Sequence, residues 1–473
     1  MDYSSLLHMR EELSLLGVMI VLLIYDIFKS ENGKTVFQIV ALLVVAAHTF
    51  ANIVPRDAFE IAGGMYTYKP IHTVLKSILN IGTLIVFMQS YSFLEQPENR
   101  IKKGEFYFLT LATLLGMYVM ISAGHFLLFF IGLEMASIPM ATLVVFDKYS
   151  RKSSEAGIKY ILSAVFASGI SVYGLSFLYA STGTLYFDDL ATIITGTPLE
   201  ILAFVFFSAG LFFKIALVPF HLWTADVYEG AQTNITSYLS VVSKGAAVVV
   251  LFTLSVKVFA PLAGQWKPLY YVLAVASITL ANLFALRQQN LKRFLAFSSI
   301  SQAGYIMLAV ISGTPLGMAS LVYYVLVYLF SNLAAFGVVS VVEQHTGKLT
   351  IDDYNGLYRS NPRLSFVMML SLFSLAGIPP FVGFFSKYFV FSAAAQQGLY
   401  VLVFIALLNT IVSLFYYLKV IKAMFLTENE TPAASIRSSL PLRLSLIICT
   451  AGILIIGLLG TVFETIGSMS FGL

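Results

Sequence analysis

One stretch decides the fold: Phe126-Leu-Leu-Phe-Phe-Ile-Gly-Leu-Glu134-Met-Ala-Ser-Ile-Pro139. In it a single carboxylate, Glu134, follows eight apolar or glycine residues. A charge inside the hydrocarbon core of a bilayer is costly, so charged residues are rare there and commonly have a function. The stretch is therefore typical of a membrane-spanning helix that carries a functional acid.

The composition of the whole chain agrees with this interpretation. Of its 473 residues, 58% are hydrophobic and only 11% are charged, and the mean hydropathy is +0.86. Soluble domains average about 25% charged residues. This composition excludes a soluble enzyme, a nucleic-acid-binding protein and a disordered chain. The single cysteine, Cys449, excludes a disulfide framework and iron–sulfur ligation, and no pair of histidines has metal-ligand spacing.

A bilayer core of roughly 30 Å needs about 20 apolar residues per helix. On this basis we predict an all-α polytopic membrane protein with about fourteen transmembrane helices and no separate soluble domain. The expected spans are 8–28, 36–54, 71–94, 105–122, 125–146, 156–181, 199–222, 233–259, 268–287, 293–312, 316–343, 364–395, 399–425 and 441–466.

The distribution of basic residues predicts the orientation of the chain. Lysine and arginine concentrate in the loops that follow odd-numbered spans and are sparse in the other loops and the termini. Cytoplasmic loops carry the excess of basic residues. The pattern therefore favours an even number of spans with both termini on the outer side of the membrane.

Six lysines, and no arginine, fall inside the predicted spans: Lys76, Lys159, Lys214, Lys244, Lys387 and Lys419. Lysine changes its protonation state readily on burial, whereas a guanidinium group stays charged. For Lys419 and for Lys76, the alternative to a buried, proton-carrying role is a side chain that reaches the membrane interface from a helix end. Lys214, Lys244 and Lys387 lie a turn or more inside their spans, and this favours a proton-carrying role for them.

Glu134 and His221 are candidates for the same proton-transfer chemistry. A nearby ammonium group can decide whether a buried carboxylate holds a proton, so Glu134 is either a proton-coupled acid or a structural acid paired with a lysine. Imidazole can accept and donate protons near neutral pH. His221 is therefore either a relay between lysines or a hydrogen-bonded structural residue.

Two spans contain proline breaks close to a lysine. They read Gly210-Leu-Phe-Phe-Lys-Ile-Ala-Leu-Val-Pro-Phe-His-Leu-Trp223 and Ala376-Gly-Ile-Pro-Pro-Phe-Val-Gly-Phe-Phe-Ser-Lys387. Proline removes a helical hydrogen bond, and ion-carrying transporters use paired interrupted helices in this way; an ordinary kink is the alternative. The spacing of Lys214 and Lys387 hints at an internal repeat of five helices.

With these residues in view, the chain resembles the antiporter-like membrane subunits of respiratory complex I. The stretches that carry the resemblance are Phe130–Pro139, Ala209–Trp223, Ala225–Gln232, Ser240–Lys244, Leu291–Tyr305 and Ser374–Lys387. Within that family, lysine rather than glutamate at position 387 favours the N subunit of bacterial NADH–quinone oxidoreductase over the M subunit. The chain departs from the family's usual prolines at Ala225, Gln232 and Asn234.

The resemblance implies two inverted five-helix repeats, here 105–259 and 268–425, preceded by three helices in 1–104 and followed by a loop and last helix in 426–473. It implies a Glu134–Lys214 pair, central lysines Lys244 and, by position, Lys159, and a terminal Lys387. Protons are then expected to approach Lys244 from the inner side, pass along a row that includes His221, and leave near Lys387.

The resemblance also implies partners. These are the other antiporter-like and small hydrophobic subunits of the complex in a bacterial inner membrane, and subunits that carry iron–sulfur clusters and, where NADH is the donor, FMN, with a quinone as acceptor. This chain itself is expected to bind no cofactor, metal or nucleic acid. A multi-subunit cation/proton antiporter, a structural scaffold and a ferredoxin-fed complex remain alternatives.

Overall fold

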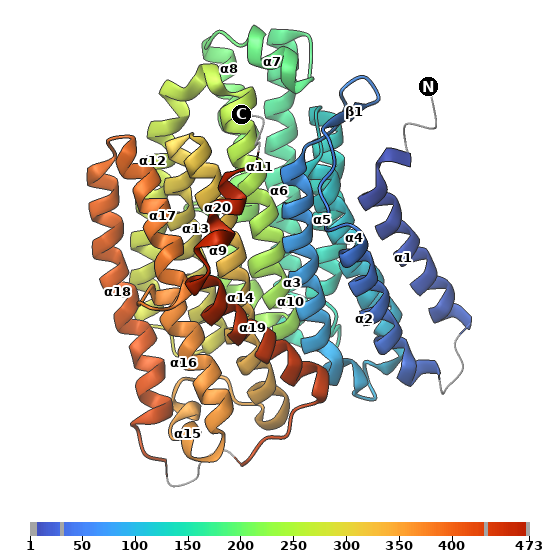
Figure 1. The fold of residues 1–473 in the computed structure, drawn as a ribbon, viewed down its shortest axis with the longest axis vertical. Helices are drawn as coiled ribbons and strands as arrows, with labels where there is room; N and C mark the ends of the chain where they lie inside the picture. The colour runs from blue at the N-terminus through green and yellow to red at the C-terminus, as the bar shows by residue number, and fades with distance from the viewer. Residues whose placement is uncertain (1–6, 29–32, 430–433, 470–473) are drawn as a thin grey trace.

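The computed structural model of the chain describes residues 7–28, 33–429 and 434–469 (Figure 1). Within these ranges nearly all the regular structure is helical. The exception is a short antiparallel hairpin of β1 (Phe59–Ile61) and β2 (Tyr66–Tyr68), which the sequence did not predict. Two helices precede this hairpin and one follows it: α1 (Arg10–Phe28), α2 (Gly33–Ala51) and α3 (Pro70–Glu95).

The next helices run from residue 100 to residue 262. They are η2 (Arg100–Lys102), α4 (Lys103–Ile121), α5 (Phe126–Val144), α6 (Arg151–Thr182), α7 (Phe187–Ile193), α8 (Pro198–Ile215), α9 (Leu222–Gly230), α10 (Thr233–Tyr238), η3 (Leu239–Ser243), α11 (Lys244–Thr253), η4 (Leu254–Val258) and η5 (Ala260–Leu262). Of these, η3 and η4 are π-helical turns within one continuous helix, and η3 ends directly before Lys244. Single π turns of this kind occur frequently at functional sites.

The remaining helices complete the bundle. They are α12 (Ala263–Leu286), α13 (Leu291–Ser312), α14 (Pro315–Thr346), η6 (Asp352–Tyr354), α15 (Leu357–Ser360), α16 (Pro362–Ala376), α17 (Val382–Gln396), α18 (Tyr400–Phe425), α19 (Leu440–Leu458) and α20 (Gly460–Gly467).

Eleven helical segments among the described residues are long and apolar enough to cross a membrane. Three predicted spans, the first, the second and the twelfth, are absent from this set, and each has a physical reason. The first, α1, carries Arg10, Glu11, Glu12 and Asp26, the second has a shorter apolar stretch, and the twelfth is broken into α16 and α17. The multi-pass helical fold is confirmed, and the number fourteen stays a prediction.

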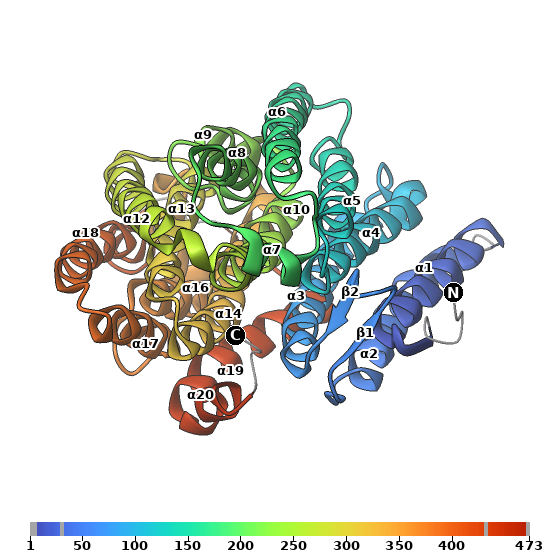
Figure 2. The ribbon, with the colours of Figure 1, turned by 90° about the horizontal axis from the view of Figure 1, so that it is seen from above.

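The centre of the bundle is formed by α13 and α14. An apolar stretch of 18 residues in α13 is 100% buried and the corresponding stretch of α14 is 94% buried, compared with 33% for those of α6 and α18. Seen from above, α1 and α2 form one edge and α17 and α18 form the other, with α14 and α13 between them (Figure 2). Apart from Arg293, the residues of α13 are therefore buried within the bundle.

The two halves of the bundle are packed alike. Helix α4 packs against α5 as α12 packs against α13, and α6 packs against both α8 and α9 as α14 packs against both α16 and α17. Helix α11 contacts α4 and α8, and α18 contacts α12 and α16 in the same way. The long helices of the two halves thus occupy corresponding places.

Both predicted breaks are present, and they have the same geometry. The residue that follows each helix, Ala216 after α8 and Gly377 after α16, lies in the left-handed backbone region. A cis proline comes three residues later in each case, Pro219 and Pro380. Counted from these positions, Lys214 corresponds to Leu375 and not to Lys387. The two lysines therefore do not occupy equivalent positions, because Lys214 precedes its break and Lys387 follows its own. The repeat of five helices stays a prediction.

Candidate functional site

Lys214 lies in the last turn of α8 and is buried at 7% exposure. Its Nζ has no hydrogen-bond partner among the described residues, although it interacts electrostatically with Glu134 on α5. Glu134 itself is half-buried. The structure therefore brings the predicted pair within range of each other without a direct hydrogen bond.

Lys244 begins α11 directly after the π turn η3 and is 2% exposed. Its Nζ donates to the backbone oxygen of Ser299 at 3.1 Å and lies 2.5 Å from the Ser299 Oγ. Ser299 belongs to the central helix α13. A hydroxyl can accept from an ammonium group or donate to a neutral amine, so this contact suits both protonation states of the lysine.

Lys387 lies in α17 after the second break and is 4% exposed. Its Nζ donates to the carbonyl of Ala376 at 2.9 Å and lies 4.7 Å from the centroid of the Tyr305 ring. A Cβ on Gly377 would stand 2.9 Å from the Lys387 Cδ. Glycine at this left-handed position (φ +85°) therefore gives the lysine stem room to reach the free end of α16.

His221 precedes α9 inside the first break and is buried at 8% exposure. Its Nδ1 has no hydrogen-bond partner among the described residues, and the same holds for the Thr224 hydroxyl one turn further on. The hydroxyls of Tyr160, Tyr228, Ser301, Tyr305 and Tyr328 are among the other buried groups without such a partner. Buried polar atoms are almost always hydrogen-bonded, and internal water is the usual remaining partner. These groups mark places where water can bind.

Lys159 differs from the other predicted lysines. Its side chain is 41% exposed and pairs with Glu155 at 2.7 Å and with Asp226 at 2.6 Å. Arg293 of α13 also binds Asp226, at 2.6 Å, and Glu229 at 3.0 Å. Lys159 is therefore not buried beside Lys244 but takes part in a half-exposed ion-pair cluster that joins α6, α9 and α13. Its part in proton transfer stays a prediction.

Lys76 is also fixed by carboxylates, but in a buried position. Its Nζ lies 2.8 Å from Glu11 and 2.6 Å from Glu12, and all three side chains are at most 6% exposed. The Tyr66 hydroxyl donates to Glu12 at 3.0 Å, and the Thr73 hydroxyl donates to Glu11. Neither interfacial snorkelling nor a free proton carrier describes this lysine, which holds α1 against α3. Lys419, near the end of α18, is half-buried.

The sequence interpretation missed the groups of α13 that meet the lysines. Gln302 lies between Ser299 and Tyr305 on this helix. Its Nε2 donates to the Leu375 carbonyl at 3.0 Å and to the Tyr417 hydroxyl at 3.2 Å. A signal was present, because Ser298-Ser-Ile-Ser-Gln302 places four polar residues within five positions of an apolar span.

A polar hollow of about 230 Å³ opens at the end of the bundle opposite the hairpin. Gln232, Thr233 and Asn234 line it from the start of α10, and Glu343 and Gln344 line it from the end of α14. Two of the positions that depart from the family's prolines, Gln232 and Asn234, thus supply polar side chains to this hollow. Further along the same two helices, Ser340 donates to Asn234 at 2.8 Å and Asn332 donates to Ser240 at 2.7 Å.

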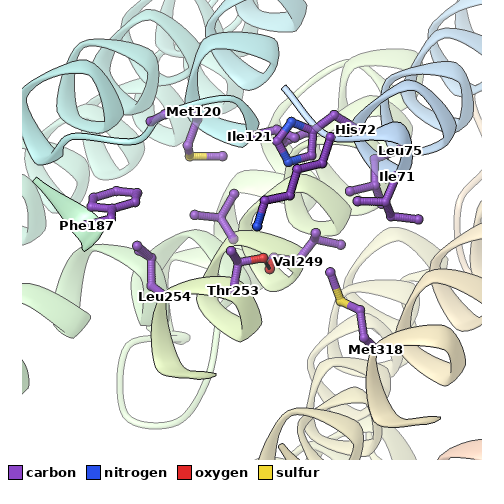
Figure 3. Close-up of a pocket in the computed structure, with 13 residues that line it drawn as sticks. Ile71, His72, Leu75, Met120, Ile121, Phe187, Val249, Thr253, Leu254 and Met318 are labelled. Atoms are coloured by element: carbon purple, nitrogen blue, oxygen red, sulfur yellow. Dashed lines mark hydrogen bonds between the residues drawn. The ribbon is translucent and has the colours of Figure 1, made fainter. Parts of the chain in front are cut away.

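A second hollow, of about 20 Å³, lies at the hairpin end of the bundle. Figure 3 shows that, His72 and Thr253 apart, its labelled side chains are apolar. Its size is about that of one water molecule, and none of Lys214, Lys244 and Lys387 lines it. The candidate site therefore does not open through this hollow.

Comparison with known proteins adds to this geometry. Residues 123–413, which contain both breaks and Lys214, Lys244 and Lys387, match the family model described as NADH:quinone oxidoreductase/Mrp antiporter, TM. The chain belongs to this family. A relative from Phocaeicola vulgatus named NADH-quinone oxidoreductase subunit N is 56% identical, with 98% of each chain covered.

Solved structures of the family have the same fold. A chain of respiratory complex I from Thermus thermophilus with bound aureothin is 30% identical with a TM-score of 0.81, and the match covers 97% of this chain and 100% of that one. A chain of the Mrp complex from Dietzia sp. has a TM-score of 0.84 at 21% identity, with 97% and 95% covered. The second likeness shows the fold alone. The recognition of the antiporter-like family of complex I is thus confirmed.

Proposed function

We propose that this chain is the proton-translocating N subunit of an NADH–quinone oxidoreductase. The observation that carries the proposal is the environment of Lys244 and Lys387. Lys244 is bonded to Ser299 and Lys387 to a backbone carbonyl, and no carboxylate acts on either among the described residues. Since no fixed negative charge holds a proton on these amines, each can be charged or neutral.

The polar hollow supports an access route to Lys244. Asn234, at its wall, is bonded to Ser340, and one to two turns further along Ser240 is bonded to Asn332. Lys244 follows Ser240 by four residues, which places the two on one face of the helix. The hollow lies among loops that follow odd-numbered predicted spans, the basic-rich side expected to face the cytoplasm.

Glu134 and Lys214 provide the means of switching. Two unit charges 4 Å apart interact by about 4 kcal/mol at an effective dielectric of 20, about a thousandfold in a proton-binding equilibrium. Tyr160 lies within electrostatic range of Glu134 and of Tyr228, and Tyr228 lies beside Ser299. A change in the Glu134–Lys214 separation can therefore alter the proton affinity of Lys244. Water bound at His221 and at the unpartnered hydroxyls would connect the two sites.

The organisation of the subunit follows from the same proposal. The corresponding packing of the two halves supports two inverted five-helix units, 105–259 and 268–425, with 1–104 and 426–473 outside them. Both termini face the outer side of a bacterial plasma membrane. Other membrane subunits bind this chain, and electron transfer from NADH to quinone takes place in partners with iron–sulfur clusters and FMN.

The test uses the assembled complex in membrane vesicles. We expect K214A and E134A to abolish redox-driven proton uptake while the complex still assembles, and K419A, which changes a half-buried lysine near a helix end, to pump normally. Normal pumping by the assembled K214A complex would refute the proposal. Cation/proton exchange without a redox substrate, by a complex free of flavin and iron–sulfur subunits, would establish the antiporter alternative.

A further inference from the structure

The central helix α13 carries the partners of Lys244 and Lys387. Ser299 contacts Lys244, and the Tyr305 ring faces Lys387. Six residues of helix separate these partners, a distance of about 9 Å. Gln302 lies halfway between them, three residues from each, and residues at this spacing share a helix face. The side chain of Gln302 is therefore on the path between the two lysines.

Gln302 is 2% exposed and fully bonded. Its amide nitrogen donates to the Leu375 carbonyl, at the end of α16 before the second break, and to the Tyr417 hydroxyl of α18. Its amide oxygen accepts from the Tyr324 hydroxyl of α14. One side chain thus binds three other helices around the path.

The groups around Gln302 are hydroxyls. Tyr417 is bonded to Ser298 at 2.6 Å, and Tyr328, one turn from Tyr324 on α14, lies beside Ser299. The described residues that join Ser299 to Tyr305 in this way include no carboxylate and no imidazole. A proton that passes between the lysines here has no titratable acid or base to rest on.

We propose that Gln302 is a positioning residue for proton transfer between Lys244 and Lys387, because it fixes the Tyr324 and Tyr417 hydroxyls in a chain. Each hydroxyl or water oxygen accepts a proton from one neighbour and releases its own to the next, so each keeps its number of protons. The hydroxyls must then rotate back to their starting hydrogen-bond direction before another proton can pass. The Lys244 ammonium loses one proton and the Lys387 amine gains one. This inference rests on the proposed function.

The test compares assembled complexes in vesicles by protons taken up per NADH oxidised. Q302L removes the bonds of the amide to three helices, and we expect uptake to fall about fivefold to tenfold. Q89L is the matched control, because Gln89 is equally buried and donates to a carbonyl of α14, that of Leu333, at 2.9 Å, but lies on α3. We expect Q89L to pump normally.

A pH profile separates positioning from packing. In Q302E the protonated acid can accept from Tyr324 and donate onward, whereas the ionised form only accepts and faces the Leu375 carbonyl. We expect Q302E to pump at low pH and to lose pumping, relative to the unmodified chain, as the pH rises. Normal pumping by Q302L, or equal loss in Q302L, Q302E and Q89L at every pH, would overturn the inference.

Three further variants make the result decisive. If Q302L does not assemble, Y324F removes one hydroxyl and nothing else, and unchanged pumping by Y324F would equally overturn the inference. K244A and K387A test the proposed function itself. If they abolish uptake while Q302L and Y324F do not, the proposed function stands and the role of Gln302 fails.

Discussion

The Nζ of Lys244 lies 2.5 Å from the Oγ of Ser299, and both side chains are buried. The hydroxyl is the one side-chain group bonded to this lysine among the described residues. It can donate to the neutral amine, which the neighbouring carbonyl of Ser299 cannot do. This contact therefore sets how easily Lys244 releases its proton.

Replacing this hydroxyl gives the first prediction. We expect S299A to lower redox-driven proton uptake by roughly fivefold to tenfold, the effect of one hydrogen bond, with assembly unchanged. S413A is the control, because Ser413 is fully buried and bonds a carbonyl of its own helix α18. Equal pumping by S299A and the unmodified complex in vesicles would contradict this role.

Gly377 gives a second prediction with a close control. G377A places a methyl group 2.9 Å from the Lys387 Cδ and in a left-handed conformation, which costs roughly 1–2 kcal/mol for residues other than glycine. G398A carries the same backbone cost at φ +76° with no atom within 4 Å. We expect both to lower the melting temperature similarly and only G377A to impair pumping. Unimpaired pumping by G377A would show that Lys387 does not depend on this space.

The buried pairing of Lys76 gives a prediction about stability. K76M leaves the carboxylates of Glu11 and Glu12 without their cation, and breaking a buried pair costs roughly 3–5 kcal/mol. We expect a lower melting temperature and poorer assembly, both restored when E11Q and E12Q are added. Complexes that do assemble should pump normally per electron. A specific pumping defect in the rescued triple variant would assign Lys76 a part in proton transfer.

The ion-pair cluster at Asp226 predicts a pH dependence. Burial raises the pKa of this carboxyl, but hydrogen bonds from Lys159 and Arg293 outweigh it and leave the pKa below its usual value. A lowered pKa in the folded state stabilises the protein above the unfolded pKa, about 4, and this contribution is lost as the pH falls through the folded value.

Removal of Lys159 tests this dependence. We expect K159M to melt below the unmodified chain at pH 6, and the difference to shrink as the pH falls below about 4, because a protonated Asp226 no longer pairs. Thermal melts of the detergent-solubilised complex across this range provide the measurement. K152M is the control, since Lys152 is 75% exposed and contacts Glu229 only at 3.4 Å. A difference that is constant with pH would contradict the assignment.

Much of the architecture could be predicted because a bilayer imposes simple rules on sequence. Apolar length located the long helices, and proline close to a lysine located both breaks. Placement within the bundle could not be predicted in the same way. Lys159 and Lys244 both fall inside apolar runs, yet one meets Asp226 and the other meets Ser299, and only the packing of distant helices decides this.

The sequence did not show which groups would meet each lysine. Glu11 and Glu12 precede an apolar run and look like the polar start of a helix, but in the fold this start of α1 reaches Lys76 of α3. Ser299, Gln302 and Tyr305 carry no charge, so a search for ionisable groups passes over them. Their proposed part in proton transfer follows from their place in the fold, because all three lie on α13 between Lys244 of α11 and Lys387 of α17.

The burial of α13 at every position except Arg293 has a consequence for how this chain can vary. Along the buried positions of such a helix, a new side chain cannot be placed without disturbing a neighbour. In a saturation-mutagenesis scan scored by respiratory growth, Leu291–Ser312 should accept the narrowest range of amino acids of any long helix. The peripheral helices α6 and α18 should accept the broadest.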